Sequence, residues 1–346
     1  MKTNPGHFLE DFQIGQIIRH ASPRTITSGD AAIYTAIYGA RFAVQASDPV
    51  AISAGYARAP LDDFLVFHMV FGKSVPDVSL NAVANLGYAE GIFHQPVFAG
   101  DTLFAQSEVI GIKENSNGKT GTVYVHTTGL NQHGDTVLSF KRWVMINKKN
   151  TEKPLGITRI PAVLERVLPE NLAKNVPVIG KIDADLWGAS HRFGDYSAGE
   201  KIDHADGVTV EEAEHMIATR LYHNTARVHF NQFAEKNGRF GKRLIYGGHV
   251  ISIARALSFN GLGNAFHIAA INGGRHIAPL FAGDTVFAWS EILEKAEIPG
   301  RDDIGAVRVM TRATKNLPCD GFPESDGNPN DAGVILALDY WAILPR

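Results

Sequence analysis

The feature that most constrains the fold of this 346-residue chain is an internal repeat. Residues 95–110 read QPVFAGDTLFAQSEVI, and residues 278–293 read APLFAGDTVFAWSEIL, at an offset of 183 positions. Upstream, DFQIGQIIRH at 11–20 corresponds to DYSAGEKIDH at 195–204, at an offset of 184. Two matches in the same order at nearly the same offset indicate that one compact module was duplicated. Two copies are too few for a solenoid, which needs at least about three.

Both halves contain the same order of expected elements. The apolar spacing predicts a helix over 28–38 and another over 211–234, and then a buried helix that begins near 61 or near 247. Alternating, β-branched runs follow and predict four strands in each half. The expected strands are 84–90, 102–113, 120–130 and 136–147 in the first half, and 267–272, 285–296, 305–313 and 334–344 in the second. One helix followed by an antiparallel meander predicts an α+β fold, with a curled sheet around a central helix.

Two segments have no copy in the other half. Residues 148–190 contain four prolines and are typical of a linker, so we expect modules at 1–150 and 191–346 with a linker over 151–190. Residues 315–333 are rich in Gly, Pro and Asp and predict a solvated loop that lengthens a hairpin. Cys319 lies in this loop, where we expect a thiol without a role.

Composition excludes several classes of protein. Lys plus Arg is 33 and Asp plus Glu is 36, so the net charge of −3 provides no field for a polyanion, and nucleic acid is not expected as a partner. No apolar run reaches the roughly 18 residues of a membrane span, and the N-terminal residues lack a signal-peptide pattern. One cysteine cannot form an internal disulfide. These features predict a soluble protein in the reducing cytoplasm without a membrane partner.

The repeat also carries a resemblance. A central helix followed by a P-V/L-x-x-G-D-T strand entry resembles the hotdog fold of MaoC-like hydratases, and two copies resemble the double hotdog. Residues 62–91 and YHNTARVHFN at 222–231 are similar to the mesaconyl-CoA hydratases within that family. The resemblance implies reversible hydration of mesaconyl-CoA to β-methylmalyl-CoA, with acyl-CoA as the substrate. It also implies no metal and no redox cofactor, and the sequence has neither a Gly-rich dinucleotide fingerprint after a strand nor H-E-x-x-H.

The resemblance implies an active site in the second half. Family members hold the catalytic water with Asp and His in the pattern D-x-N-P-x-H, and His229 falls on that His while Asn224 replaces the Asp. Residues 46–51 lack the His, which predicts a non-catalytic first half that binds substrate or CoA. Gly248 corresponds to the family's oxyanion glycine. Asn224 cannot take a proton at pH 7. We therefore expect either that its hydrogen bonds are enough to orient the catalytic water, or that a carboxylate from elsewhere joins the site, with Asp63 and Glu90 as the candidates.

The remaining expectations concern substrate binding and alternatives. The free carboxylate of mesaconyl-CoA needs a cationic partner, for which Arg227 and Arg275 are the first choices and Arg41 a third. Tyr246 and His249 flank the glycine and are candidate substrate contacts. Hydration of another enoyl-CoA, hydrolysis of an acyl-CoA thioester and non-catalytic acyl binding remain open alternatives. A double module already mimics a dimer, so a homodimer is compatible with the sequence but not required.

Overall fold

The computed structural model describes residues 2–180, 182–325 and 333–346. In the first half the elements are η1 (Leu9–Asp11), β1 (Ile17–Arg19), β2 (Arg24–Thr25), α1 (Ser28–Tyr38), α2 (Ala43–Ala46), α3 (Asp48–Ser53), α4 (Asp63–Ser74), η2 (Val75–Ser79), β3 (Ala82–Phe93), β4 (Thr102–Glu114), β5 (Thr120–Leu130) and β6 (Thr136–Asn147). The second half has η4 (Phe193–Asp195), β8 (Lys201–Thr209), α6 (Glu212–Leu221), η5 (Arg227–His229), α7 (Gln232–Glu235), α8 (Gly247–Leu257), α9 (Phe259–Leu262), β9 (His267–His276), β10 (Thr285–Glu297), β11 (Ile304–Lys315) and β12 (Val334–Pro345). Between the halves lie β7 (Thr158–Arg159), η3 (Pro169–Asn171) and α5 (Ala184–Trp187).

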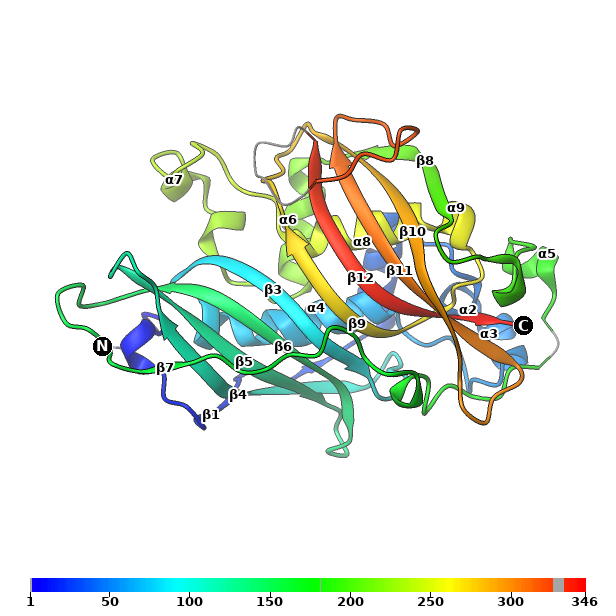
Figure 1. The fold of residues 1–346 in the computed structure, drawn as a ribbon, viewed down its shortest axis with the longest axis horizontal. Coiled ribbons are helices and arrows are strands. Elements are labelled where there is room, and N and C mark those ends of the chain that lie inside the picture. Colours follow the sequence, from blue (N-terminus) through cyan, green and yellow to red (C-terminus); the bar gives the residue numbers. More distant parts are fainter. Residues whose placement is uncertain (1, 181, 326–332) are drawn as a thin grey trace.

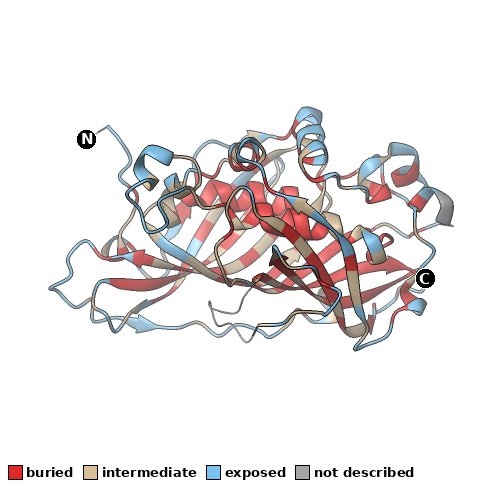
Figure 2. Cartoon of the chain, turned by 90° about the horizontal axis from the view of Figure 1, so that it is seen from above, coloured by how far each residue is buried: buried red, intermediate tan, exposed pale blue. Residues whose placement is uncertain are grey.

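The halves share one sheet. Across the described residues, twelve strands pair, and the main path runs β1-β4-β5-β6-β3-β9-β12-β11-β10-β8. The junction is the antiparallel pair β3–β9, in which Tyr88 lies opposite Gly274 and Ile92 opposite Ala270. Each half of the sheet curls around its own helix, α4 or α8 (Figure 1), and these two helices form the buried centre seen from above in Figure 2. The α+β prediction of a curled sheet around a central helix is confirmed.

A repeated polar triad explains two of the histidines in the sequence repeat. The His20 Nε2 and Ser107 Oγ atoms are 2.8 Å apart, and Ser107 Oγ is 2.8 Å from Thr127 Oγ1. The corresponding triad of the second half joins His204, Ser290 and Thr311 with the same two distances of 2.8 Å. Because these hydroxyls and imidazoles are buried, they need each other as hydrogen-bond partners, and the repeated histidines serve the fold.

The predicted helix over 211–234 was wrong in its second part. Helix α6 ends at Leu221, and His223 has a left-handed backbone with φ of 55°. The Asn224 Oδ1 atom accepts a hydrogen bond of 2.9 Å from the Ala226 amide, a side-chain contact that competes with helical hydrogen bonding. The chain then continues through the short turns η5 and α7.

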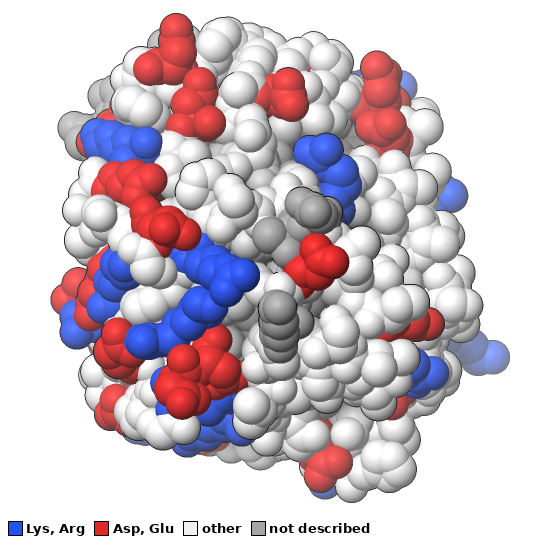
Figure 3. Space-filling view, turned by 90° about the vertical axis from the view of Figure 1, so that its right-hand side faces the viewer, with Lys and Arg blue, Asp and Glu red and all other residues white. Residues whose placement is uncertain are grey.

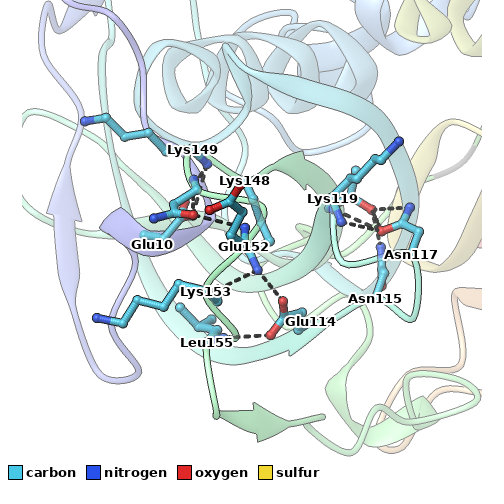
Figure 4. Close-up of polar contacts among 12 residues, drawn as sticks. Glu10, Glu114, Asn115, Asn117, Lys119, Lys148, Lys149, Glu152, Lys153 and Leu155 are labelled. Carbon is cyan, nitrogen blue, oxygen red and sulfur yellow. Dashed lines mark hydrogen bonds and ion pairs between the residues drawn. The ribbon is translucent and has the colours of Figure 1, made fainter.

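The segment between the halves packs against the sheet. At its start, Glu10 accepts hydrogen bonds from the backbone amides of Lys149 and Asn150, and Glu114 pairs with Lys148 (Figure 4). Further along, the Val167 amide donates to Asn272 Oδ1 at 2.8 Å. The buried apolar residues of this segment are Val167, Leu172, Ala173, Val176, Ile179, Ile182 and Trp187. The segment therefore belongs to the core as much as it connects the modules.

The expectation of a wholly solvated loop over 315–333 was wrong for its first part. Cys319 is only 2% exposed, and its Sγ atom lies 3.5 Å from Thr314 Oγ1. The carbonyl of Pro323 accepts a hydrogen bond of 2.9 Å from the Trp289 indole. The start of the loop packs on β10 and thereby buries the large apolar surface of the Trp289 ring. Residues 326–332 lie outside the described residues.

The outer surface carries charges of both signs. On the face at the C-terminal end of the sheet, Lys and Arg alternate with Asp and Glu (Figure 3). Among the described residues, every helix is too short or too polar to cross a bilayer.

Candidate active site

The candidate site is built on the start of α8. Helix geometry leaves the amides of Gly247 and Gly248 without intrahelical acceptors, and the helix dipole adds partial positive charge there. A Cβ atom on Gly248 would lie 2.7 Å from two ring atoms of His68, and one on Gly247 would collide with the His276 ring. Only glycine therefore lets these rings approach the helix start, where the two amides have no intrahelical acceptor.

His229 has a defined hydrogen-bonding role. It ends η5, is half-buried, and its Nδ1 atom lies 2.9 Å from the carbonyl oxygen of Leu244. A carbonyl only accepts, so Nδ1 carries the proton and Nε2 presents a lone pair. Burial lowers the pKa of His229 to about 4, so the ring is neutral and able to accept a proton at pH 7. The ring centroid lies 5.3 Å from that of Tyr246.

Asn224 and Tyr246 are two further residues of this site. Asn224 is buried, and its Oδ1 atom accepts a hydrogen bond from the Ala226 amide. Burial raises the pKa of Tyr246 well above its usual value, with the nearby Tyr88 hydroxyl adding to the effect. Tyr246 therefore stays a neutral phenol that can donate a hydrogen bond at every physiological pH.

His249 extends the group into the interior. Its Nδ1 atom lies 2.9 Å from the Tyr38 hydroxyl, which accepts a hydrogen bond of 2.7 Å from Tyr222. Burial lowers the pKa of His249 to about 3, with a smaller contribution from the charge of His215. His249 is 1% exposed, and its ring packs in the interior beside the helix start.

Sequence reasoning missed the residues that the first half contributes. His68 of α4 is fully buried, and neither ring nitrogen has a partner among the described residues. Burial lowers its pKa to about 3, helped by His276 and His249. Tyr88 of β3 reaches His276 Nε2 at 3.2 Å. His68 lies on the buried helix predicted to begin near 61, but its contact with α8 depends on how the halves pack.

The two candidate carboxylates lie elsewhere. Asp63 begins α4, five residues before His68, and its carboxylate pairs with His267 at 3.0 Å. Glu90 accepts hydrogen bonds from Lys141 Nζ at 2.7 Å and from the Leu164 amide at 2.9 Å. The expectation that one of them joins His229 is therefore not met, because each is held by partners of its own.

The three arginines differ in their surroundings. Arg227 and Arg275 are exposed, and within the described ranges neither has an ion-pair partner. They adjoin the site in sequence, Arg227 two residues before His229 and Arg275 next to His276. Arg41 stacks over the Phe259 ring at 4.6 Å. The first two are thus free to bind an anion, while Arg41 has an aromatic partner.

The fold is a double hotdog, and the central helix of its second half, α8, begins with two glycines beside His229. This combination is typical of MaoC-like hydratases. A family model described as "Mesaconyl-CoA hydratase" matches residues 2–316, and the chain belongs to that family of hydro-lyases. The "Beta-methylmalyl-CoA dehydratase" of Chloroflexus aurantiacus is 57% identical, with 100% of this chain and 99% of the relative covered. The "Mesaconyl-CoA hydratase" of Cereibacter sphaeroides is 53% identical, with both chains fully covered, at 100% each.

Solved structures agree with the fold. A MaoC domain protein dehydratase from Chloroflexus aurantiacus superposes with a TM-score of 0.97 at 56% identity, covering 100% of this chain and 99% of that one. A double-hotdog protein of Mycobacterium tuberculosis superposes with a TM-score of 0.71 at 23% identity, covering 99% of both chains. The second likeness concerns the fold alone. The double-hotdog prediction is confirmed.

Proposed function

We propose that this enzyme catalyses the reversible addition of water to mesaconyl-CoA to form β-methylmalyl-CoA, with His229 as the base. Family membership and the identities of 53% and 57% to a mesaconyl-CoA hydratase and a β-methylmalyl-CoA dehydratase support the substrate. The observation that carries the proposed mechanism is the hydrogen bond between His229 Nδ1 and the Leu244 carbonyl. It leaves Nε2 as the proton acceptor beside the start of α8.

The proposed chemistry uses only protein groups. Nε2 of His229 takes a proton from water while the water oxygen bonds to the β-carbon, and the double-bond electrons move onto the thioester oxygen. The Gly247 and Gly248 amides stabilise that oxyanion, a contribution of about 10²–10³ in rate per donor. The imidazolium then returns its proton to the α-carbon, so the net change is one added water. Neither a metal nor a redox cofactor takes part, and CoA enters as part of the substrate.

Arg227 is our choice for the second carboxylate of the substrate. It is exposed, lacks an ion-pair partner within the described ranges and lies two residues before the proposed base. A guanidinium binds a carboxylate through two parallel hydrogen bonds, which fixes its orientation as well as its charge. Arg275, next to His276, is the alternative.

The test compares mesaconyl-CoA and crotonyl-CoA by loss of enoyl absorbance, with a thiol reagent to detect released CoA. We expect hydration of mesaconyl-CoA without free thiol. His229→Ala should lower kcat by about 10²–10⁴-fold, the usual contribution of a positioned base. His133→Ala, in an exposed hairpin turn, is the matched control. Thiol release by the wild-type protein would indicate a thioesterase, and absence of any turnover would indicate an acyl-binding subunit.

We also propose a cytoplasmic enzyme that works without a second copy. The start of α8, in the second half, is completed by His68 and Tyr88 of the first half, so one chain supplies the whole site. Light scattering combined with activity over a range of protein concentrations tests this, and specific activity should not change on dilution.

A further inference from the structure

The start of α4 forms a second candidate site, at the position in the first half that corresponds to the start of α8. Asp63 corresponds to Gly247 at the repeat offset of 184. Two cavities adjoin there, one of about 10 Å³ and one of about 140 Å³. Gln45 and Pro60 line both, so the cavities share a wall. His229 lines neither of them.

The smaller cavity contains an Asp–His pair drawn from the two halves. Asp63 Oδ1 lies 3.0 Å from His267 Nδ1, and Asp63 Oδ2 accepts a hydrogen bond of 2.7 Å from the Ile268 amide. Because the Asp63 carboxylate only accepts hydrogen bonds, the Nδ1 atom of His267 carries the proton and its Nε2 atom presents a lone pair. This is the arrangement of a histidine base that a carboxylate holds in position. Both residues line the cavity, whose volume suits one water molecule.

Gln45 supplies a further acceptor at this point. Its Nε2 atom donates a hydrogen bond of 2.6 Å to the Phe266 carbonyl. Its Oε1 atom is buried and has no partner in the described part of the chain. A buried acceptor without a partner is costly unless a water or ligand supplies the hydrogen bond. At the repeat offset of 184, the residue that corresponds to His229 is Gln45, so the earlier comparison with residues 46–51 was out of register.

The larger cavity contains a carboxyl group among apolar walls. Its lining includes Phe42, Leu61, Leu65, Tyr34 and Asp62. Asp62 Oδ1 accepts hydrogen bonds from the Phe64 amide at 2.9 Å and from the Tyr34 hydroxyl at 3.1 Å. Burial, and then the charge of Asp63, raise the pKa of Asp62 to about 6, so this group exchanges a proton near neutral pH. A cavity of this volume holds a group of about five or six carbons.

We propose that the start of α4 is a second acyl-thioester hydration centre, in which His267, oriented by Asp63, activates water and Asp62 protonates the substrate. It rests on the hydratase chemistry proposed above. His267 Nε2 takes a proton from water as the oxygen bonds to the β-carbon of an enoyl thioester. The double-bond electrons then form a bond from the α-carbon to the proton of the Asp62 carboxyl. One water is added in total, and proton exchange with solvent restores both groups.

The test measures hydration by the His229→Ala protein, in which the first site is disabled. We expect residual turnover of mesaconyl-CoA or crotonyl-CoA that falls about 10²-fold or more when His267→Gln is added. Glutamine keeps an amide donor for Asp63, so the hydrogen bond between the two halves is retained. Circular dichroism and the melting temperature should stay unchanged. His133→Gln in the same background is the matched control and should leave the residual turnover as it was.

Three outcomes would overturn the second centre. The His229→Ala protein could show no residual turnover, or residual turnover that His267→Gln does not lower. It could also release free thiol instead of hydrating the substrate. The proposed function fails separately, when the wild-type protein hydrates neither substrate. If the folded double variant keeps the residual turnover of His229→Ala, the Asp63–His267 pair only joins the halves.

Discussion

Replacing Asp62 by Asn should stabilise the protein by an amount that depends on pH. The folded protein raises the pKa of this carboxyl from 3.8 to about 6, because burial disfavours the charged form. A shift of about 2 units corresponds to about 3 kcal/mol. The unfolded chain loses this proton near pH 3.8 and the folded chain near pH 6, so the folded state binds more protons between these values. Its stability therefore falls as pH rises through this window, and the full cost of about 3 kcal/mol remains above it.

The asparagine protein has no such titration and keeps an acceptor for the Phe64 amide at the start of α4. Urea unfolding at pH 5, 6, 7 and 8 measures the difference in stability between the two proteins. Linkage predicts that the advantage of Asp62→Asn grows by about half of the total, roughly 1.5 kcal/mol, from pH 5 to pH 8. Asp62→Ser, which also retains a capping oxygen, should show the same pH dependence. If the stability difference from the wild-type protein does not change with pH in either variant, the argument that burial of the charged Asp62 carboxylate destabilises the fold is refuted.

Three further predictions concern glycine contacts and buried histidines. Gly72→Ala should destabilise the protein by about 3 kcal/mol or more in urea unfolding, because its Cβ would overlap the Tyr222 carbonyl oxygen, whereas Gly194→Ala meets nothing within 4 Å and should change stability little. Gly248→Ala should lower kcat by about 10²-fold, because its Cβ would overlap the His68 and Tyr246 rings and displace the amide proposed to bind the oxyanion; a change in KM alone would contradict that role. Burial depresses the pKa values of His68 and His249 to about 3, so both stay neutral in the folded protein while the unfolded chain takes up protons below about 6.5. Stability should therefore fall as pH drops from 6.5 toward 4, followed by circular dichroism, and an acid-stable fold would contradict it.

Local patterns predicted most of the elements. The strands at 120–130 and 136–147 have the predicted bounds, because alternation and hairpin turns act over neighbouring residues. The helix over 28–38 was also correct. The helix over 211–234 was not, since its end at Leu221 depends on the contact of the next turn with α4. Strands β1, β2 and β8 were not predicted, because β1 and β2 are very short and β8 is an edge strand with few buried residues.

Some residues of the site could be predicted from the sequence, and others could not. His229, Asn224 and Gly248 came from the resemblance to MaoC-like hydratases, carried by motifs in the second half. Asp63 was misplaced, because its partner His267 lies 204 positions away in the sequence. No local pattern encodes such a pair.

The sequence by itself determined that one module occurs twice and which central helices and long strands each copy forms. These features depend on interactions between residues close together in the chain. The tertiary structure alone decided that β3 pairs with β9, and that pairing brings His68 to Gly248 and Asp63 to His267. Such contacts arise from the packing of two curled surfaces against each other, so each helix start is completed by side chains from both halves.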